Sequence, residues 1–388
     1  MDQSAIRAWW AHRQGLDGSF TDATSETVLE RSGWARSVAG VNPYLTLFAR
    51  AGVSRERADA DVAALHIHEL PAARGCTYVI PAADFALALR CGREAAHVPL
   101  KIAAKLGVTP GEIDTLCEAV ASALKKGPLD PDGIREATGS ASRSLGAEGV
   151  KKGMSTTLPL ALGLLQSTGV IRRVPVNGRL DQQRYTYTIW DLKPAKLDDG
   201  EVFIELARRY FRWIGPATMA EFQWFSGLGV KAAKAAVEPL SLQALESDRL
   251  MFPDDLDSLR SFKPPKKPVV HLIASIDSLI HHRRDHKSLL DSADAAFAGD
   301  KGPVQSATIA DLPNHAIVDR GRIVGAWEYD PSAERIVYAT FGQKTKEIAA
   351  AMAHTAAFIR DQLGDARSFS LDSPKSREPR LKQLRGER

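Results

Sequence analysis

The chain has 388 residues, of which 44% are hydrophobic and 25% charged, and its formal net charge is +4. A single hydrophobic core rarely organises so long a chain, so we expect about two to four globular domains. No apolar run is long enough to span a bilayer and the N-terminus has no signal-peptide core, so we expect no membrane association and a cytoplasmic location. The mild positive charge is compatible with a polyanionic partner but does not require one.

Several kinds of cofactor site are excluded by the motifs. The three cysteines, Cys76, Cys91 and Cys117, form no CxxC pair, which argues against a disulfide framework and a cysteine zinc site. His282 and His286 are spaced like zinc ligands, but arginines flank them and no third ligand is near, so we predict no metal. The sequence has no phosphate-binding glycine loop, so we expect no nucleotide or other cofactor.

The first part of the chain has the pattern of a helical unit closed by a hairpin. Apolar periodicity predicts helices near residues 6–13, 25–32, 43–51 and 55–65. The stretch IHELPAARGCTYVIP then reads as two short strands around a turn.

The same order of elements recurs after Gly127. The stretches PDGIREATG and TTLPLALGLLQSTG predict two helices, separated by a Gly/Ser-rich segment. VIRRVPV and RYTYTIW then predict a hairpin, because Asn177-Gly178 between them is a strong turn signal.

A third copy begins near residue 201. A helix with one apolar face ends at Gly215-Pro216, and Thr218 followed by Glu221 is the signature of a helix N-terminus. A further short helix carries Lys231 and Lys234 on its outer face, and LQALESDRLMFP predicts a hairpin. Three helices followed by a hairpin is the order of a winged helix.

The last third changes character. After the linker SFKPPKKP, the segments VVHLIASI, HAIVDRG, RIVGAWEYD and RIVYATF predict antiparallel strands. An amphipathic helix ending at Gly364 follows, and SPKSREPRLKQLRGER predicts a frayed basic tail. We therefore predict an α+β protein of tandem winged-helix (helix-turn-helix) domains at 1–110, 111–198 and 199–262. A small C-terminal antiparallel β-barrel with a closing helix occupies 263–365, and the basic tail 366–388.

An ordered set of segments along the chain resembles one known family. PYLTLFARAG, ARGCTYVIPAADFALAL, RYFRWIGPATMAEFQWFSGL, IASIDSLIHHRRD and NHAIVDRGRIVGAWEYD occur in this order. Together they resemble the YcaQ/AlkZ-like DNA glycosylases, helix-turn-helix proteins that excise alkylated bases and unhook interstrand crosslinks. The resemblance implies double-stranded DNA, alkylated or carrying a bulky adduct, as the partner.

The resemblance breaks at the family's catalytic signature. That signature is a Gln-aliphatic-Gln or Gln-aliphatic-Asp tripeptide just before the segment matching PYLTLFAR, where this chain has WARSVAGVNPY. Arg36-Ser37-Val38 lies nearest to the expected register, and Asn42 is the nearby side-chain amide. In the family's RGTLH-like segment, the histidine is replaced by Tyr78, four residues after Arg74.

Hydrolysis of an alkylated base requires an extruded nucleotide, a held water and stabilisation of an oxocarbenium ion. We predict Asp277 as the remaining carboxylate, because the resemblance places its loop near DNA; the alternative is a turn or cap Asp. Arg36 and Asn42 complete the catalytic candidates. A cation at Arg36 disfavours a cationic base, which indicates phosphate binding or a different substrate. Trp34 either stacks on an extruded base or fills the core.

Basic residues in the predicted wings, helices and loops are candidates for DNA contact. The alternative for each is a solvated charged face. The candidates are Arg74, Tyr78, Arg172, Arg173, Arg179, Arg184, Lys231, Lys234, Arg283 and Arg284.

Three functions remain open on the sequence alone. The first is a DNA glycosylase-like repair enzyme that excises alkylated bases. The second is a catalytically silent DNA-binding protein of the same fold, for lesion recognition or regulation, which the missing Gln signature favours. The third is a winged-helix fold used for protein or small-molecule binding. The short, alanine-rich AAKAAVEPL helix argues against reading of base edges.

Overall fold

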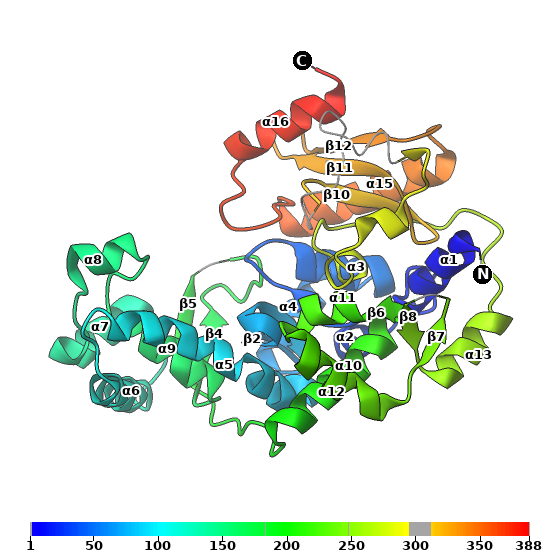
Figure 1. Ribbon diagram of the computed structural model, residues 1–388. Coiled ribbons are helices and arrows are strands. Elements are labelled where there is room, and N and C mark those ends of the chain that lie inside the picture. Colours follow the sequence, from blue (N-terminus) through cyan, green and yellow to red (C-terminus); the bar gives the residue numbers. More distant parts are fainter. Residues whose placement is uncertain (1, 183, 247, 295–311, 388) are drawn as a thin grey trace.

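The computed structural model describes residues 2–182, 184–246, 248–294 and 312–387. The described strands form four antiparallel sheets, and helices surround them (Figure 1). The mixed helix and strand content confirms the predicted α+β class at that coarse level.

The N-terminal unit has the predicted helices and hairpin. Thr24 and Ser54 accept hydrogen bonds from backbone amides and so begin α2 and α4, whereas Gly52 ends α3 in the left-handed conformation. The strands form a sheet in the order β1-β3-β2. The elements are α1 (Gln3–Arg13), α2 (Ser25–Ser32), β1 (Ala35–Arg36), α3 (Asn42–Ala51), α4 (Arg55–Ala63), β2 (Ile67–Pro71) and β3 (Thr77–Pro81).

The second unit projects to one side of the molecule as a lobe with its own apolar core (Figure 1). Its predicted hairpin is confirmed, with Gly178 at φ 73° after Asn177 in the turn that joins the two paired strands. The long helix α5 (Phe85–Ala104) begins in the core of the first and third units and leads into this lobe. The elements that follow are α6 (Pro110–Leu124), α7 (Pro131–Thr138), α8 (Gly146–Lys151), α9 (Leu158–Ser167), β4 (Ile171–Pro175) and β5 (Tyr185–Ile189).

The third unit follows the predicted order of three helices and a hairpin. Thr218 and Glu221 form the expected reciprocal cap at the start of α11. A short strand before α11 joins the hairpin in the order β6-β8-β7. The elements are α10 (Asp199–Ile214), β6 (Ala217–Thr218), α11 (Met219–Ser226), α12 (Val230–Val237), β7 (Gln243–Leu245), β8 (Arg249–Met251) and α13 (Pro253–Ser261).

The C-terminal strands form an open sheet in the order β12-β11-β10-β9. Since β9 and β12 are its two edges and do not pair among the described residues, the predicted barrel closure is not confirmed. Helix α15 packs against β9, and α16 packs against β11 and β12. The elements are β9 (Val270–Ile273), α14 (Ser278–His281), β10 (His315–Asp319), β11 (Arg322–Asp330), β12 (Arg335–Thr340), α15 (Lys346–Phe358) and α16 (Pro374–Arg385).

The last segment corrects one prediction. The supposed frayed tail contains α16, which lies on the sheet at one end of the molecule (Figure 1). Arg377 pairs with Asp365 at 2.7 Å, and Arg380 pairs with the fully buried Glu328 at 2.9 Å. The basic composition looked like that of a solvated tail because the acidic partners of these arginines come from earlier elements.

Within the described ranges, no helix is both long and apolar enough to cross a membrane.

Candidate functional site

The segment after α2 carries Arg36 to the edge of the N-terminal sheet. Arg36 pairs with Tyr78 across β1 and β3, and the Ser37 amide donates a 3.0 Å hydrogen bond to the Thr77 carbonyl. Nη1 of Arg36 donates to that same carbonyl at 2.6 Å, and its guanidinium lies 5.6 Å from the centre of the Tyr78 ring. These contacts hold residues 36–42, which we call the signature segment, against the sheet.

Two cavities share Arg36, Val38 and Phe369 in their linings. The first, which we call the arginine cavity, has a volume of about 400 Å³. The second, the serine cavity, has a volume of about 440 Å³. Besides the shared residues, the arginine cavity is lined mainly by Arg74, Trp224, Ser275, His281, Arg284 and Arg380, and the serine cavity by Ser37, Thr77, Arg173, Tyr185 and Leu371.

The arginine cavity gathers positive charge around one aromatic ring. The guanidinium groups of Arg74 and Arg284 lie 3.9 Å and 4.7 Å from the centre of the Trp224 ring. The His281 ring meets the same indole edge-on at 5.0 Å. No acidic side chain is found among the described residues that line this cavity. Arg380 pairs with Glu328 and Asp372, whereas the half-buried Arg36 and Arg74 and the exposed Arg284 have no acid beside them in the lining. Such arginines attract phosphate, which guanidinium binds in a bidentate manner.

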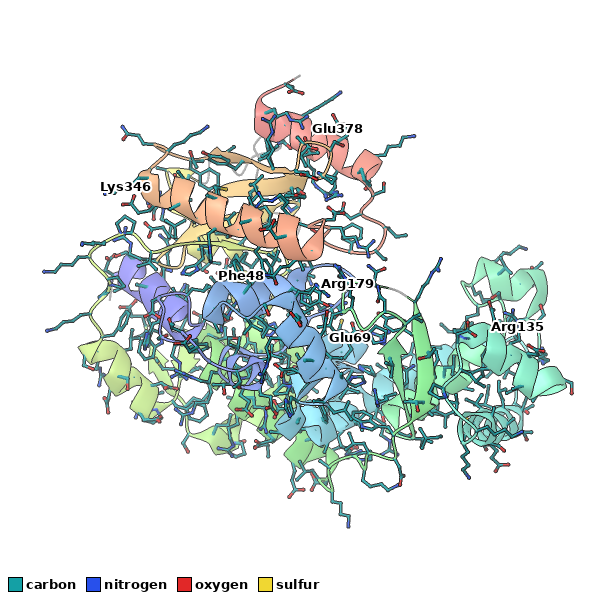
Figure 2. All side chains as sticks on the ribbon, turned by 180° about the vertical axis from the view of Figure 1, so that it is seen from behind. Phe48, Glu69, Arg135, Arg179, Lys346 and Glu378 are labelled. Atoms are coloured by element: carbon teal, nitrogen blue, oxygen red, sulfur yellow. The ribbon has the colours of Figure 1, made fainter. Side chains whose placement is uncertain are left out.

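A buried carboxylate, Glu69, lies behind the serine cavity and contacts two of its lining residues. Ser37 Oγ donates a hydrogen bond to Glu69 Oε1, and Arg173 lies 3.1 Å from Glu69 Oε2. Burial opposes the charge of Arg173, but Glu69 and two nearby tyrosines outweigh it and raise the arginine pKa. Burial and the Glu69 charge also raise the pKa of Tyr185 to about 12. Figure 2 labels Glu69 in the interior, away from the side lobe that carries Arg135.

Asn42, the last residue of the signature segment, and Asp277 are both buried. Asp277 forms a two-pronged ion pair with Arg50, with both N–O distances 2.8 Å, and also accepts hydrogen bonds from Thr46 and the Leu279 amide. The Asn42 amide donates to the Arg36 carbonyl at 2.7 Å. Neither Asp277 nor Asn42 lines the arginine cavity or the serine cavity, and both Asp277 oxygens accept hydrogen bonds from described residues. The catalytic roles of these two residues stay predictions from the sequence.

Arg283 and Arg284 are neighbours with opposite environments. Arg283 is buried over the Trp10 ring at 3.6 Å and donates a 3.2 Å hydrogen bond to the Pro216 carbonyl. Burial lowers the pKa of Arg283 to about 10. The predicted phosphate contact does not fit Arg283, because its guanidinium is enclosed, whereas Arg284 is exposed and lines the arginine cavity.

The remaining DNA-contact candidates are scattered. Arg179 pairs with Asp181 at 2.8 Å and donates to the Leu363 carbonyl, so it joins the second unit to the C-terminal region. Figure 2 labels Arg179 at this junction. Arg172 is half-buried on β4 and Arg184 is exposed just before β5. Lys231 and Lys234 are exposed on α12, but neither they nor Arg172, Arg179 and Arg184 line the two cavities described above.

Sequence reasoning missed three residues of the candidate site: Trp224 and Phe369, which line the cavities, and Glu69, which lies behind the serine cavity. An acidic residue inside the apolar strand IHELP was the one available signal for Glu69. Trp34 is buried, with its indole donating to Asp84 at 2.7 Å, which supports the core reading of this residue. Among the described residues, no group of three or more His, Cys, Asp or Glu could hold a metal ion.

The fold is a mixed α and β protein built from helix–hairpin units. Its arginine-rich cavity, which also contains an aromatic ring, is suited to a polyanionic ligand. The family model described as DNA glycosylase AlkZ-like matches residues 37–361, and the chain therefore belongs to the AlkZ-like DNA glycosylase family. The solved structure of Streptomyces sahachiroi DNA glycosylase AlkZ has the same fold, with a TM-score of 0.71 and 19% sequence identity. The similarity covers 95% of this chain and 98% of that chain. No curated protein matches the sequence.

Proposed function

We propose that this chain is a winged-helix DNA-binding protein that excises a damaged base from double-stranded DNA by hydrolysing the N-glycosidic bond. The observation that carries the proposal is the hydrogen bond between Ser37 and the buried Glu69 carboxylate. Ser37 lies where the family resemblance expects a catalytic tripeptide, and it lines a cavity next to a group of arginines. A polar group at this position can hold a water molecule in place of the missing glutamine.

The arginine cavity binds the phosphates of the DNA backbone. Arg36, Arg74 and Arg284 line a cavity that has no acidic side chain among its described lining residues, so their charges are available to phosphate oxygens. Phosphates bound there place the extruded nucleotide beside Arg36, the residue that both cavities share. Trp224 provides an apolar face on which a sugar or base can lie.

The chemical step then uses the serine cavity. Glu69 accepts the hydroxyl proton of Ser37, whose oxygen in turn accepts a proton from the attacking water. The water oxygen bonds to C1′ of the sugar as the bond from C1′ to the base nitrogen breaks, and the electron pair leaves with the base. The products are a free base and an abasic site with a hydroxyl on C1′. Before it accepts the proton, the negative charge of the Glu69 carboxylate stabilises the oxocarbenium character that develops as the bond to the base lengthens.

Two conservative substitutions test this proposal. We expect Glu69→Gln and Ser37→Ala to reduce base release from an N7-alkylguanine duplex by roughly 10²–10⁴-fold. Binding to the same duplex should stay within a factor of about three, because neither substitution removes a phosphate ligand. Glu94→Gln, at an exposed acid on α5, is the matched control. Unchanged base release in both site variants, with folding verified by thermal unfolding, would remove Ser37 and Glu69 from the mechanism.

A second function is favoured by the loss of the family signature. With Asp277 and Asn42 both buried and engaged, the chain can act as a catalytically silent DNA-binding protein for lesion recognition or regulation. Salt-sensitive binding of the wild type without base release, on both N7-alkylguanine and a bulky adduct, would support this function over the first.

A further inference from the structure

The segment that follows α15 forms a loop that is hydrogen-bonded to the signature segment and carries two exposed apolar side chains. Residues 367–372 cross the signature segment, and Val41 donates to the Arg367 carbonyl at 3.0 Å while Ser370 donates to the Val38 carbonyl at 3.2 Å. The approach is close enough that a Cβ on Gly40 would lie 2.1 Å from the Ser368 carbonyl oxygen. This loop, which we call the C-terminal tip, is therefore fixed against the candidate site.

Further contacts hold the base of the tip. Asp372 accepts a 3.0 Å hydrogen bond from the Ser368 amide, and Arg380 of α16 pairs with Asp372 at 2.7 Å. Both Ser368 and Asp372 are buried. Between these two anchors, the side chains of Phe369 and Leu371 point outward, with 43% and 82% of their surfaces exposed.

Exposure of these two apolar side chains forgoes the stability that their burial would provide, so folding does not explain it. Burial of a leucine or phenylalanine side chain stabilises a folded protein, and a well-anchored loop can turn such residues inward. Phe369 lines both cavities, and Leu371 lines the serine cavity. The surroundings include Arg36, so the apolar tip stands beside positive charge.

We propose that Phe369 and Leu371 form a wedge that enters the base stack of double-stranded DNA where a nucleotide leaves it. The inference rests on the proposed function, because it places the extruded nucleotide at Arg36. An apolar side chain inserted between base steps offsets the lost stacking and keeps the nucleotide out. Arginines next to the wedge hold the phosphates on either side, and this charge complementarity selects a polyanion over an apolar protein surface.

The tip lies beyond the residues that the family model matches, which end at 361. Glycosylase-family membership therefore does not by itself supply the wedge. The anchoring arginine, Arg380, belongs to the same terminal segment as the two apolar residues. Tip and anchor thus lie in one C-terminal segment that packs against the signature segment.

The test uses full-length protein and a duplex with N7-alkylguanine flanked by 2-aminopurine, whose fluorescence rises on unstacking. We expect wild-type protein to raise the fluorescence, and Phe369→Ser and Leu371→Ser to reduce this rise at least about threefold. Affinity for the duplex should fall roughly 10-fold, whereas affinity for a single-stranded oligonucleotide should not change, because a single strand has no gap to fill. Val150→Ser is the matched control, since Val150 is 62% exposed and lies in the side lobe on α8.

The outcomes separate the wedge from the proposed function. Wild-type unstacking and affinity in both serine variants would overturn the wedge and leave the proposed function in place. Absence of salt-sensitive duplex binding by the wild type would overturn the proposed function, and the wedge with it. Leu371→Met should retain the fluorescence rise, because methionine preserves the apolar volume that a wedge requires.

Discussion

Two groups of charged side chains lie at the signature segment, and they differ in whether their charges are paired within the protein. Beneath it, Asp277 and Arg50 have fully buried side chains and form an ion pair, and Arg50 Nη2 also donates hydrogen bonds to Gln14 and Ser278. In the arginine cavity, Arg74 and Arg284 meet an aromatic ring but no acid among the described residues. The charges of the first group are paired within the protein, whereas those of the second group are free to bind a ligand.

The difference teaches which charges can act on DNA. A buried pair contributes to the stability and shape of the segment that it supports, and removing one partner leaves the other uncompensated. An exposed arginine contributes little to folding but can neutralise a phosphate. The same residue types therefore predict opposite experimental signatures, with loss of stability in one case and loss of binding in the other.

The largest effect is expected from breaking the buried pair. Asp277→Asn should lower the free energy of unfolding by about 3–5 kcal/mol, because Arg50 remains buried without a countercharge. Urea unfolding measures this change. Asp361→Asn, which removes an exposed partner of Arg360, should change stability by less than about 1 kcal/mol.

The same variant also tests the catalytic role predicted for Asp277 from sequence. A stable Asp277→Asn protein that binds DNA but has lost base release would restore that role. It would also show that the carboxylate becomes accessible when DNA is bound.

The structure explains why some of these features were predictable and others were not. Helices and hairpins were predictable because their signals are local, such as the Thr218–Glu221 cap and the Asn177-Gly178 turn. The ion pair of Asp277 was not, because Arg50 lies 227 residues earlier in the chain. Composition identifies Asp277 as a carboxylate but cannot say that an arginine from another element covers it.

The candidate site was predictable only as a location. The family resemblance directed attention to Arg36 and Ser37, but the Glu69 partner depends on the strand order β1-β3-β2. The C-terminal tip was missed for a similar reason: Arg377 and Arg380 read as solvated charges until their acidic partners are known. The Glu69 contact and the anchoring of the tip both depend on polar groups that are far apart in the sequence, and no local sequence pattern predicts such contacts.

A pH-dependent effect of intermediate size is expected from His315, a buried residue that holds the loop leading to the tip. Its Nδ1 accepts a 3.0 Å hydrogen bond from the Ser275 amide, and its Nε2 lies 2.9 Å from the Ala366 carbonyl, so the neutral ring fits both contacts. Burial lowers the pKa of His315 to about 4 from its ordinary value of 6.5. Because the folded pKa is depressed, this stability is present above pH 6.5 and is lost as the pH falls toward 4.

We therefore expect His315 to account for about 2 kcal/mol of the stability lost between pH 7 and pH 5. His315→Gln should be less stable at pH 7 but should show a correspondingly shallower loss on acidification, measured by urea unfolding at both pH values. His97→Gln, at a half-buried position on α5, should keep the wild-type slope. A wild-type slope in His315→Gln would assign the acid sensitivity to other buried groups.

The smallest effects distinguish the arginine cavity from the outer face of α12. Arg284→Ala should weaken binding to a lesion-bearing duplex by roughly 10-fold and reduce the salt slope by about 1, without a measurable change in stability. Lys231→Ala/Lys234→Ala should weaken binding by less than about threefold, and equally for damaged and undamaged duplexes, because α12 lines neither cavity. Arg135→Ala, in the side lobe of Figure 2, is the control for loss of an exposed charge. If the lysine pair has the larger and lesion-dependent effect, α12 rather than the arginine cavity is the surface that recognises damage, because a change confined to non-specific phosphate contacts cannot discriminate between the two duplexes.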